Sequence, residues 1–231
     1  MSRADLASGQ VIRMSLLFRV QHLLLTVLLL VLEVTGFSLM YHENAFAQAI
    51  IRLEGGVHNR GIVHRIAAVL LMANVLHHLF YMLFSREGRK EFDGLIIGRQ
   101  DIDDFLQSLQ YNIGASAEYP RFGKYWYKEK FQYWGASVGT VLISLTGFML
   151  WAEDFSMRFF PKFVLDLALV IHGYQGLLAF VILFFWHLYN VHLHPSVFPM
   201  NLSWITGKVS AEWLRQEHPL EYEKLKEEGL L

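Results

Sequence analysis

Two histidines, fifteen residues apart, lie in the last long apolar stretch of this 231-residue chain, and histidine is a common ligand of haem iron. An α-helix advances about 1.5 Å and about 100° per residue, so His172 and His187 would lie about 22 Å apart along the helix axis and about 60° apart around it. That axial separation is typical of two haems stacked across a bilayer, each held by one histidine from this helix and one from another helix. The spacing therefore predicts two bis-histidine sites.

The partner histidines can be selected by their depth in the other apolar stretches. His64, at the start of the second stretch, matches His172, and His22, near the start of the first, matches His187. His78 follows His64 by fourteen residues, about 21 Å further along nearly the same helix face, so a second scheme in which the second and fourth helices supply two ligands each stays open. Each histidine taken alone could be a core residue bonded to a neighbouring helix, but four at two matched depths without an acidic partner favour iron ligation.

The composition excludes several other chemistries. The chain has no cysteine, which excludes disulfides, thiolate zinc sites, iron–sulfur clusters and the attachment of a c-type haem. Twenty basic and 21 acidic residues give a formal net charge of −1, so there is no signature of nucleic-acid binding.

The elements that must position the histidines are long apolar helices. Hydrophobic residues make up 54% of the chain and charged residues 18%, and the mean hydropathy is +0.30. The apolar residues fall into four blocks, each near the ~20 residues that a helix needs to cross a ~30 Å hydrocarbon core. These blocks are residues 16–40, 62–84, 131–151 and 163–190. We therefore predict an all-α integral membrane protein, a four-helix bundle that forms one domain over residues 1–231.

The distribution of lysine and arginine predicts the orientation of the bundle. Fifteen of these residues flank the ends of the helices that would share one side of the membrane, beginning with Arg3, Arg13 and Arg19, against five on the other side. The positive-inside rule then places both termini in the cytoplasm.

The connections between the blocks differ in character. Residues 41–63 are expected to form an outer loop and residues 152–162 a short outer turn. Within the inner loop, residues 85–130, the sequence from Asp101 to Asp104 predicts an Asp-capped amphipathic helix at the membrane interface. After Pro195 and Pro199, the segment 195–231 is expected to be cytoplasmic, with a charged helix that begins at Ser210.

The remaining histidines have simpler explanations. His77 points away from the face of His64 and is expected to contact a headgroup or a neighbouring helix. His192 and His194 are expected beyond the end of the fourth helix, at the surface. His42, His58 and His218 are expected to be ordinary loop residues.

Several short motifs resemble a known family. Arg19-x-x-His22 followed by Leu32-x-x-Thr35-Gly36, and Thr146-Gly147-x-x-x-Trp151 further on, resemble motifs of the membrane cytochrome b subunits of formate dehydrogenases, thiosulfate reductases and nickel–iron hydrogenases. The basic and aromatic segment 123–134 and the ending are also similar, in particular to the formate dehydrogenase gamma subunit. The motifs of that ending are His187-Leu-Tyr189, Gly207-Lys-Val-Ser210, Trp213 and His218-Pro219.

This resemblance implies two b-type haems held by ligands on the first, second and fourth helices. The matching residues are His22, His64, His172 and His187, which favours the first pairing scheme over the one with His78. The chain departs from the family in two places. The two histidines of the fourth helix are fifteen residues apart rather than about fourteen, and His192-x-His194-Pro195 is an unusual extension.

The implied function is that of a dihaem subunit in the cytoplasmic membrane of a bacterium. It would pass electrons between an iron–sulfur or multihaem cytochrome subunit on the outer face and a quinone that binds near the inner haem. Lys130, Tyr133 and Trp134 are the candidate quinone contacts, although such residues also serve as interfacial anchors. Arg19 and Arg65 are candidate partners of the haem propionates and are equally explicable as residues that extend toward the headgroups.

The sequence is also compatible with two other functions. One is a haem-free helical membrane module in which the histidines serve a metal or proton pathway for transport. The other is a transmembrane b-type reductase that acts without further subunits. A spectrum of the isolated protein separates the first from a cytochrome, and turnover with a soluble donor would support the second.

Overall fold

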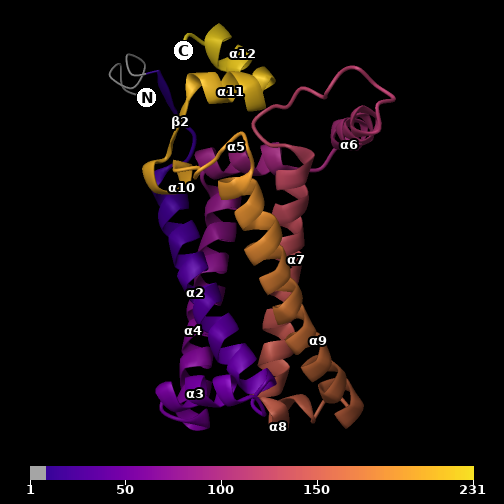
Figure 1. The fold of residues 1–231 in the computed structure, drawn as a ribbon. Helices are drawn as coiled ribbons and strands as arrows, with labels where there is room; N and C mark the ends of the chain where they lie inside the picture. The colour runs from indigo at the N-terminus through magenta and orange to yellow at the C-terminus, as the bar shows by residue number, and fades with distance from the viewer. Residues whose placement is uncertain (1–8) are drawn as a thin grey trace. The chain divides into compact units, whose positions relative to one another are not determined.

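The computed structural model describes residues 9–231, so Arg3 lies outside the described residues. It has four helices long and apolar enough to cross a membrane (Figure 1). They are α2 (Leu16–Met40), α4 (Val57–Phe84), α7 (Tyr127–Trp151) and a composite fourth helix made of α9 (Lys162–Val181), η1 (Ile182–His187) and η2 (Tyr189–Leu193). The predicted all-α membrane architecture is therefore confirmed.

The bounds of these helices differ from the expected ones by a few residues. The first agrees, but α4 begins five residues before the predicted start and α7 begins four residues early. In both helices the additional first turn is polar, and polar residues are stable in a helix that extends into the headgroup region. The fourth helix ends at Leu193 rather than at Asn190. It does not stop at Asn190 because its last part continues as π-helix.

The chain forms two compact units. One, the histidine unit, contains residues Val20–His78 and Ala136–Pro199, and the other, the terminal unit, contains the remaining described residues. In the histidine unit α2 packs on α4 through a cluster of Leu28, Ala67 and Leu71. Large apolar side chains such as Leu30 and Val138 are exposed on the outer faces of the helices, as expected for surfaces that meet lipid.

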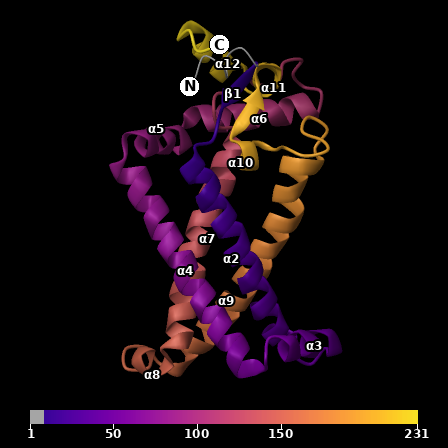
Figure 2. The same ribbon diagram turned by 90° about the vertical axis from the view of Figure 1, so that its left-hand side faces the viewer.

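Two short helices lie in the connections of the histidine unit. These are α3 (Ala45–Leu53), within the segment expected to be an outer loop, and α8 (Glu153–Ser156). Figures 1 and 2 show both at the same end of this unit. Asn44 caps α3 by accepting a hydrogen bond from the Phe46 amide at 2.8 Å.

The terminal unit contains a two-stranded sheet that the sequence did not predict. Strand β1 (Gln10–Ile12) pairs antiparallel with β2 (Lys208–Ser210), and Val11 lies opposite Val209. Both valines pack against Leu214 of α11 (Ala211–Glu217), which is capped by the Ser210 hydroxyl as expected. The charged C-terminal helix is interrupted at Pro219, where α12 (Pro219–Glu227) begins.

The predicted amphipathic helix is also present in the terminal unit. It is α6 (Arg99–Asn112), and it begins two residues before Asp101. Asp101 is therefore not the cap but the third helical residue, and its carboxylate accepts a hydrogen bond from the Gly98 amide at 2.8 Å. Two further helices of this unit were not predicted, α5 (Arg86–Leu95) and the single turn α10 (Ser203–Thr206).

Candidate functional site

The histidine unit contains two pairs of facing imidazoles. The ring centroids of His64 and His172 lie 6.3 Å apart, and those of His22 and His187 lie 6.2 Å apart. Two imidazoles bound to opposite faces of one metal ion would have centroids about 6.2 Å apart, since the metal–nitrogen bond is about 2.0 Å and the ring centre lies about 1.1 Å beyond the nitrogen. Both pairs therefore have the separation that a bis-histidine haem requires.

A threonine of α2 orients the His64 ring. The Thr35 hydroxyl donates its proton to the Val31 carbonyl oxygen at 2.7 Å, so at 2.8 Å it accepts the hydrogen bond of the His64 Nδ1–H. The proton of the neutral ring is thereby assigned to Nδ1, and Nε2 keeps the lone pair that a metal needs.

The His172 ring is oriented in the same way by α7. Its Nδ1 lies 3.0 Å from the carbonyl oxygen of Ile143 and 3.2 Å from the hydroxyl of Thr146. A carbonyl oxygen can only accept, so Nδ1 carries the proton and Nε2 is again the nitrogen suited to iron.

Each of these threonines is followed by a glycine that lies beside the same ring. A β-carbon on Gly36 would lie 3.7 Å from Cε1 of His64, and one on Gly147 would lie only 2.9 Å from Cε1 of His172. The missing side chain of Gly147 lets the His172 ring lie against α7, where a β-carbon would clash with it. The donor set and the separation of the two rings fit a haem at the His64–His172 pair.

The His22–His187 pair is positioned by a different local structure. His187 is the last residue of η1, in which each turn closes through an i→i+5 hydrogen bond and so takes up an extra residue. Fifteen residues with one π turn advance the helix about as far as fourteen residues of regular α-helix. The π geometry therefore accounts for the spacing by which the chain departs from the family, and the azimuth of 60° expected for a regular helix does not apply.

His192 also lies in this region, within η2, where a surface position beyond the helix was expected. It follows His187 by five residues, about one turn of π-helix. The expectation that it lies beyond the helix is wrong because the π segments extend the helix to Leu193.

His78, the rival ligand, is held by a buried glutamine of α2. Gln21 accepts a hydrogen bond from Nδ1 of His78 at 3.1 Å and donates one to Nδ1 of His77 at 2.8 Å. Asn74 completes the cluster by donating to the backbone carbonyl of Gln21 at 3.1 Å. The interhelical contact expected for His77 is therefore confirmed.

The two arginines predicted to bind propionates have other contacts. Arg65 is exposed, and its guanidinium carbon lies 5.6 Å from the ring centroid of Trp151. Arg19 lies in the terminal unit, where it donates to the carbonyl oxygen of Ile205 at 2.5 Å.

The predicted quinone contacts lie in the terminal unit, in the first turns of α7. Lys130 forms an ion pair with Asp101 at 2.9 Å, and the indole nitrogen of Trp134 donates to the Leu95 carbonyl at 2.9 Å. The rings of Tyr133 and Trp134 meet edge to face at 5.7 Å. Lys130 and Trp134 therefore tie α7 to the α5–α6 connection.

His218 is not the ordinary loop residue that the sequence suggested. It is 2% exposed, donates from Nδ1 to the Gly123 carbonyl at 2.6 Å, and accepts from the Arg13 guanidinium at 3.2 Å. Burial and the charge of Arg13 lower the pKa of His218 to about 3. Its role is structural, and the sequence carries no local signal of it because both partners are distant in the chain.

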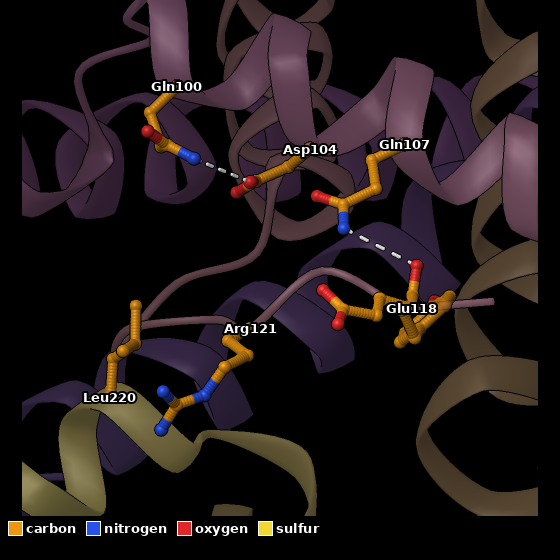
Figure 3. Close-up of a pocket in the computed structure, with 7 residues that line it drawn as sticks. Gln100, Asp104, Gln107, Glu118, Arg121 and Leu220 are labelled. Atoms are coloured by element: carbon orange, nitrogen blue, oxygen red, sulfur yellow. Dashed lines mark hydrogen bonds between the residues drawn. The ribbon is translucent and has the colours of Figure 1, made fainter. Parts of the chain in front are cut away.

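A surface pocket of about 580 Å³ lies in the terminal unit between α6, α12 and the segment that links α6 to α7 (Figure 3). Six of its seven lining residues have polar side chains, and two hydrogen bonds join residues of the lining, from Gln100 to Asp104 and from Gln107 to the Glu118 carbonyl. Within residues 9–231 no group of three or more His, Cys, Asp or Glu side chains is arranged to hold a bare metal ion.

Four apolar helices with facing histidine pairs define a class of protein, the membrane-spanning b-type cytochromes. Residues 13–204 match the prokaryotic cytochrome b561 family, and the chain belongs to that family. It is thus a membrane-spanning b-type cytochrome of prokaryotic type.

Two relatives show the branch that the chain resembles. It is 24% identical over 129 residues to the cytochrome b556(Fdn) subunit of the nitrate-inducible formate dehydrogenase of Escherichia coli (strain K12), covering 55% of this chain and 56% of the relative. It is 20% identical over 210 residues to the cytochrome b556(fdo) subunit of formate dehydrogenase from the same strain, covering 90% of both chains. The chain thus spans little more than half the length of the first relative.

Proposed function

We propose that the chain is a dihaem subunit that transfers electrons across the membrane between an extracytoplasmic redox partner and the quinone pool. The observation that carries this proposal is the presence of two histidine pairs, each with centroids 6.2 to 6.3 Å apart, near opposite ends of the long helices. His64 and His172 would hold the outer haem, and His22 and His187 the inner one. Haem iron supplies reversible one-electron transfer when it is bound.

The chain itself contributes ligand orientation and an apolar environment. Thr35 and the Ile143 carbonyl fix the Nδ1 protons of His64 and His172, so each ring presents Nε2. The apolar helices keep water from the sites, and their span sets the distance between them. The polar termini of the chain would lie in the cytoplasm, as the excess of basic residues on that side indicates.

The partner is proposed from the relatives. Both are named as cytochrome subunits of formate dehydrogenases, and an extracytoplasmic iron–sulfur or multihaem cytochrome subunit is the partner expected for a protein of this kind. A stand-alone reductase would instead turn over with a soluble donor in the absence of any other subunit.

Quinone is proposed as the exchangeable substrate, with Tyr133 as its contact. Lys130 and Trp134 already donate to groups of the terminal unit, so they would act by fixing the start of α7. A Tyr133→Phe variant is expected to raise the KM for quinol while the haem content stays at the wild-type value. An unchanged KM would exclude the phenol as a quinone contact.

The decisive experiment counts haems in the purified full-length protein and in single variants. The wild type is expected to hold two low-spin b haems per chain, and His22→Ala and His64→Ala are each expected to hold one. His78→Ala is the matched control, because His78 is bonded to Gln21, and it should keep both haems. A colourless wild type would refute the proposal, and loss of haem at His78 with full retention at His22 would overturn the pairing.

A further inference from the structure

Arg60 is a buried cation on the same face of α4 as His64. It precedes His64 by four residues, one helical turn, and is only 8% exposed. Its Nη1 donates a hydrogen bond to the carbonyl oxygen of Thr35. Thr35 thus contacts both side chains, Arg60 through its carbonyl oxygen and His64 through its hydroxyl.

The hydrogen-bonding capacity of Arg60 is not used up by these contacts. A guanidinium has five donor hydrogens, and within the part of the chain that the structure describes its Nε is buried without an acceptor. Its charge is not paired directly either. Glu54 attracts it electrostatically without forming an ion pair, and the Glu54 carboxylate accepts a hydrogen bond from the Ser38 hydroxyl at 3.4 Å.

A buried cation in this state is costly unless an anion meets it. A guanidinium that is removed from water without a carboxylate partner is strongly destabilising, because nothing compensates for the lost hydration of its charge. Arg60 lies one turn before His64 on α4 and both side chains contact Thr35, so the guanidinium lies close to the histidine pair. A carboxylate bound beside the His64 ring would therefore satisfy Arg60.

Arg65 differs from Arg60 in its surroundings. It is exposed, its guanidinium faces the Trp151 ring, and the nearby groove is lined by apolar side chains such as Ile62 and Val69. An exposed arginine already placed over an aromatic ring has no unsatisfied buried donor.

We propose that Arg60, and not Arg65, binds a propionate carboxylate of the haem at the His64–His172 pair. This inference rests on the proposed function, because it requires a haem at that pair. The free Nε–H and the neighbouring terminal N–H are suited to a forked, charge-assisted hydrogen bond with the two oxygens of a carboxylate.

The test uses Arg60→Gln, Arg60→Lys and, as the matched control, Arg65→Gln in the full-length protein. Redox titration gives the midpoint potential of each haem, and resonance Raman spectroscopy gives the propionate bending bands. Arg60→Gln is expected to lower the midpoint of one haem only, since loss of the cation leaves the propionate charge uncompensated. Arg60→Lys is expected to have a midpoint potential close to that of the wild type, because lysine retains the positive charge. Its propionate band is expected to shift, because lysine cannot form the forked hydrogen bond. Arg65→Gln should leave the band unchanged.

The outcomes separate this inference from the proposed function. If the wild type holds two haems and both Arg60 variants leave the propionate bands and midpoints unchanged, the inference is overturned and the proposed function stands. Equal shifts in Arg60→Gln and Arg65→Gln would also overturn it, because they would reflect charge alone. If Arg60→Gln does not accumulate, the propionate band of Arg60→Lys decides the question: a shifted band supports the inference and an unchanged band overturns it. A wild type without haem at this pair refutes both.

Discussion

His172 in the histidine unit and His218 in the terminal unit begin from the same arrangement. Each has its Nδ1–H bonded to a backbone carbonyl of another segment, Ile143 for His172 and Gly123 for His218. They differ in the groups that contact the remainder of each imidazole ring. The His218 Nε2 accepts from Arg13, and its ring contacts Trp213, whereas the His172 ring faces His64. A bond from Nδ1–H to a backbone carbonyl is therefore shared by the structural His218 and by His172, the proposed ligand, and what separates them is the group that the rest of the ring meets.

The largest expected effect comes from removing each of these two rings. His172→Ala should lose one of two haems, so the haem content per chain falls to about half. His218→Ala should keep both haems and instead lower the free energy of unfolding by about 1–3 kcal/mol, because the partly buried Gly123 carbonyl loses its donor and Arg13 loses one of its acceptors. A pyridine haemochrome assay and a thermal melt measure the two effects. Haem loss in both variants to the same extent would contradict the distinction.

The next effect concerns the space beside the two rings of the pair. Gly147→Ala would place a β-carbon 2.9 Å from His172, and a ring that is both bonded to Ile143 and ligated to iron has no room to move away. We expect partial loss of one haem in Gly147→Ala. Gly36→Ala is the matched control, since its β-carbon would lie at an ordinary 3.7 Å from His64 and should leave the haem content unchanged. A larger loss of haem in Gly36→Ala than in Gly147→Ala would contradict this account of the two glycines.

A smaller effect is expected from the two threonines. Thr35 supplies the acceptor for His64, whereas His172 has the Ile143 carbonyl in addition to Thr146. Thr35→Val should therefore raise the midpoint of one haem more than Thr146→Val does, by roughly 40 mV for a hydrogen bond of about 1 kcal/mol. Thr140→Val is the control, because the Thr140 hydroxyl donates to the Ala136 carbonyl within its own helix. Equal shifts of the midpoint potential in all three variants would rule out a specific effect of the hydrogen bonds to the His64 and His172 rings.

The smallest effect is the pH dependence that His218 brings. Its pKa is lowered to about 3 in the folded protein, so the unfolded chain binds a proton more readily from about pH 6.5 downward. Its contribution to stability is present above that pH and decreases as the pH falls toward 3, by about 1 kcal/mol between pH 6.5 and pH 5.5. Chemical denaturation of His218→Gln and of the wild type at these two pH values measures the difference. A parallel pH dependence in both proteins would assign the effect to other groups.

The sequence was a good guide to the long helices and to which histidines face each other. Apolar blocks as long as residues 16–40 form helices in a bilayer. Matched depth, together with the family motifs, predicts the pairs His64–His172 and His22–His187, whose rings face each other in the structure. Thr35-Gly36 and Thr146-Gly147 were visible as motifs, but their contacts with the rings depend on how the helices pack.

Other features depend on contacts that no local pattern contains. Strands β1 and β2 are three residues long and pair across almost the whole chain, so neither has a detectable periodicity. His218 is buried by Arg13 and Gly123, both far away in sequence. Arg60 and Arg65 have similar positions at the start of the second apolar stretch, and only the packing against Thr35 separates the buried one from the exposed one.

The π turns of the fourth helix hold more residues per turn than an α-helix does. A regular helix that loses one residue rotates everything beyond the deletion by about 100°, which would turn His187 away from His22. A helix that already carries an extra residue in η1 can instead release it and return to α geometry with the ligand in place. The chain can therefore lose a residue here without giving up the contact between the His22 and His187 rings.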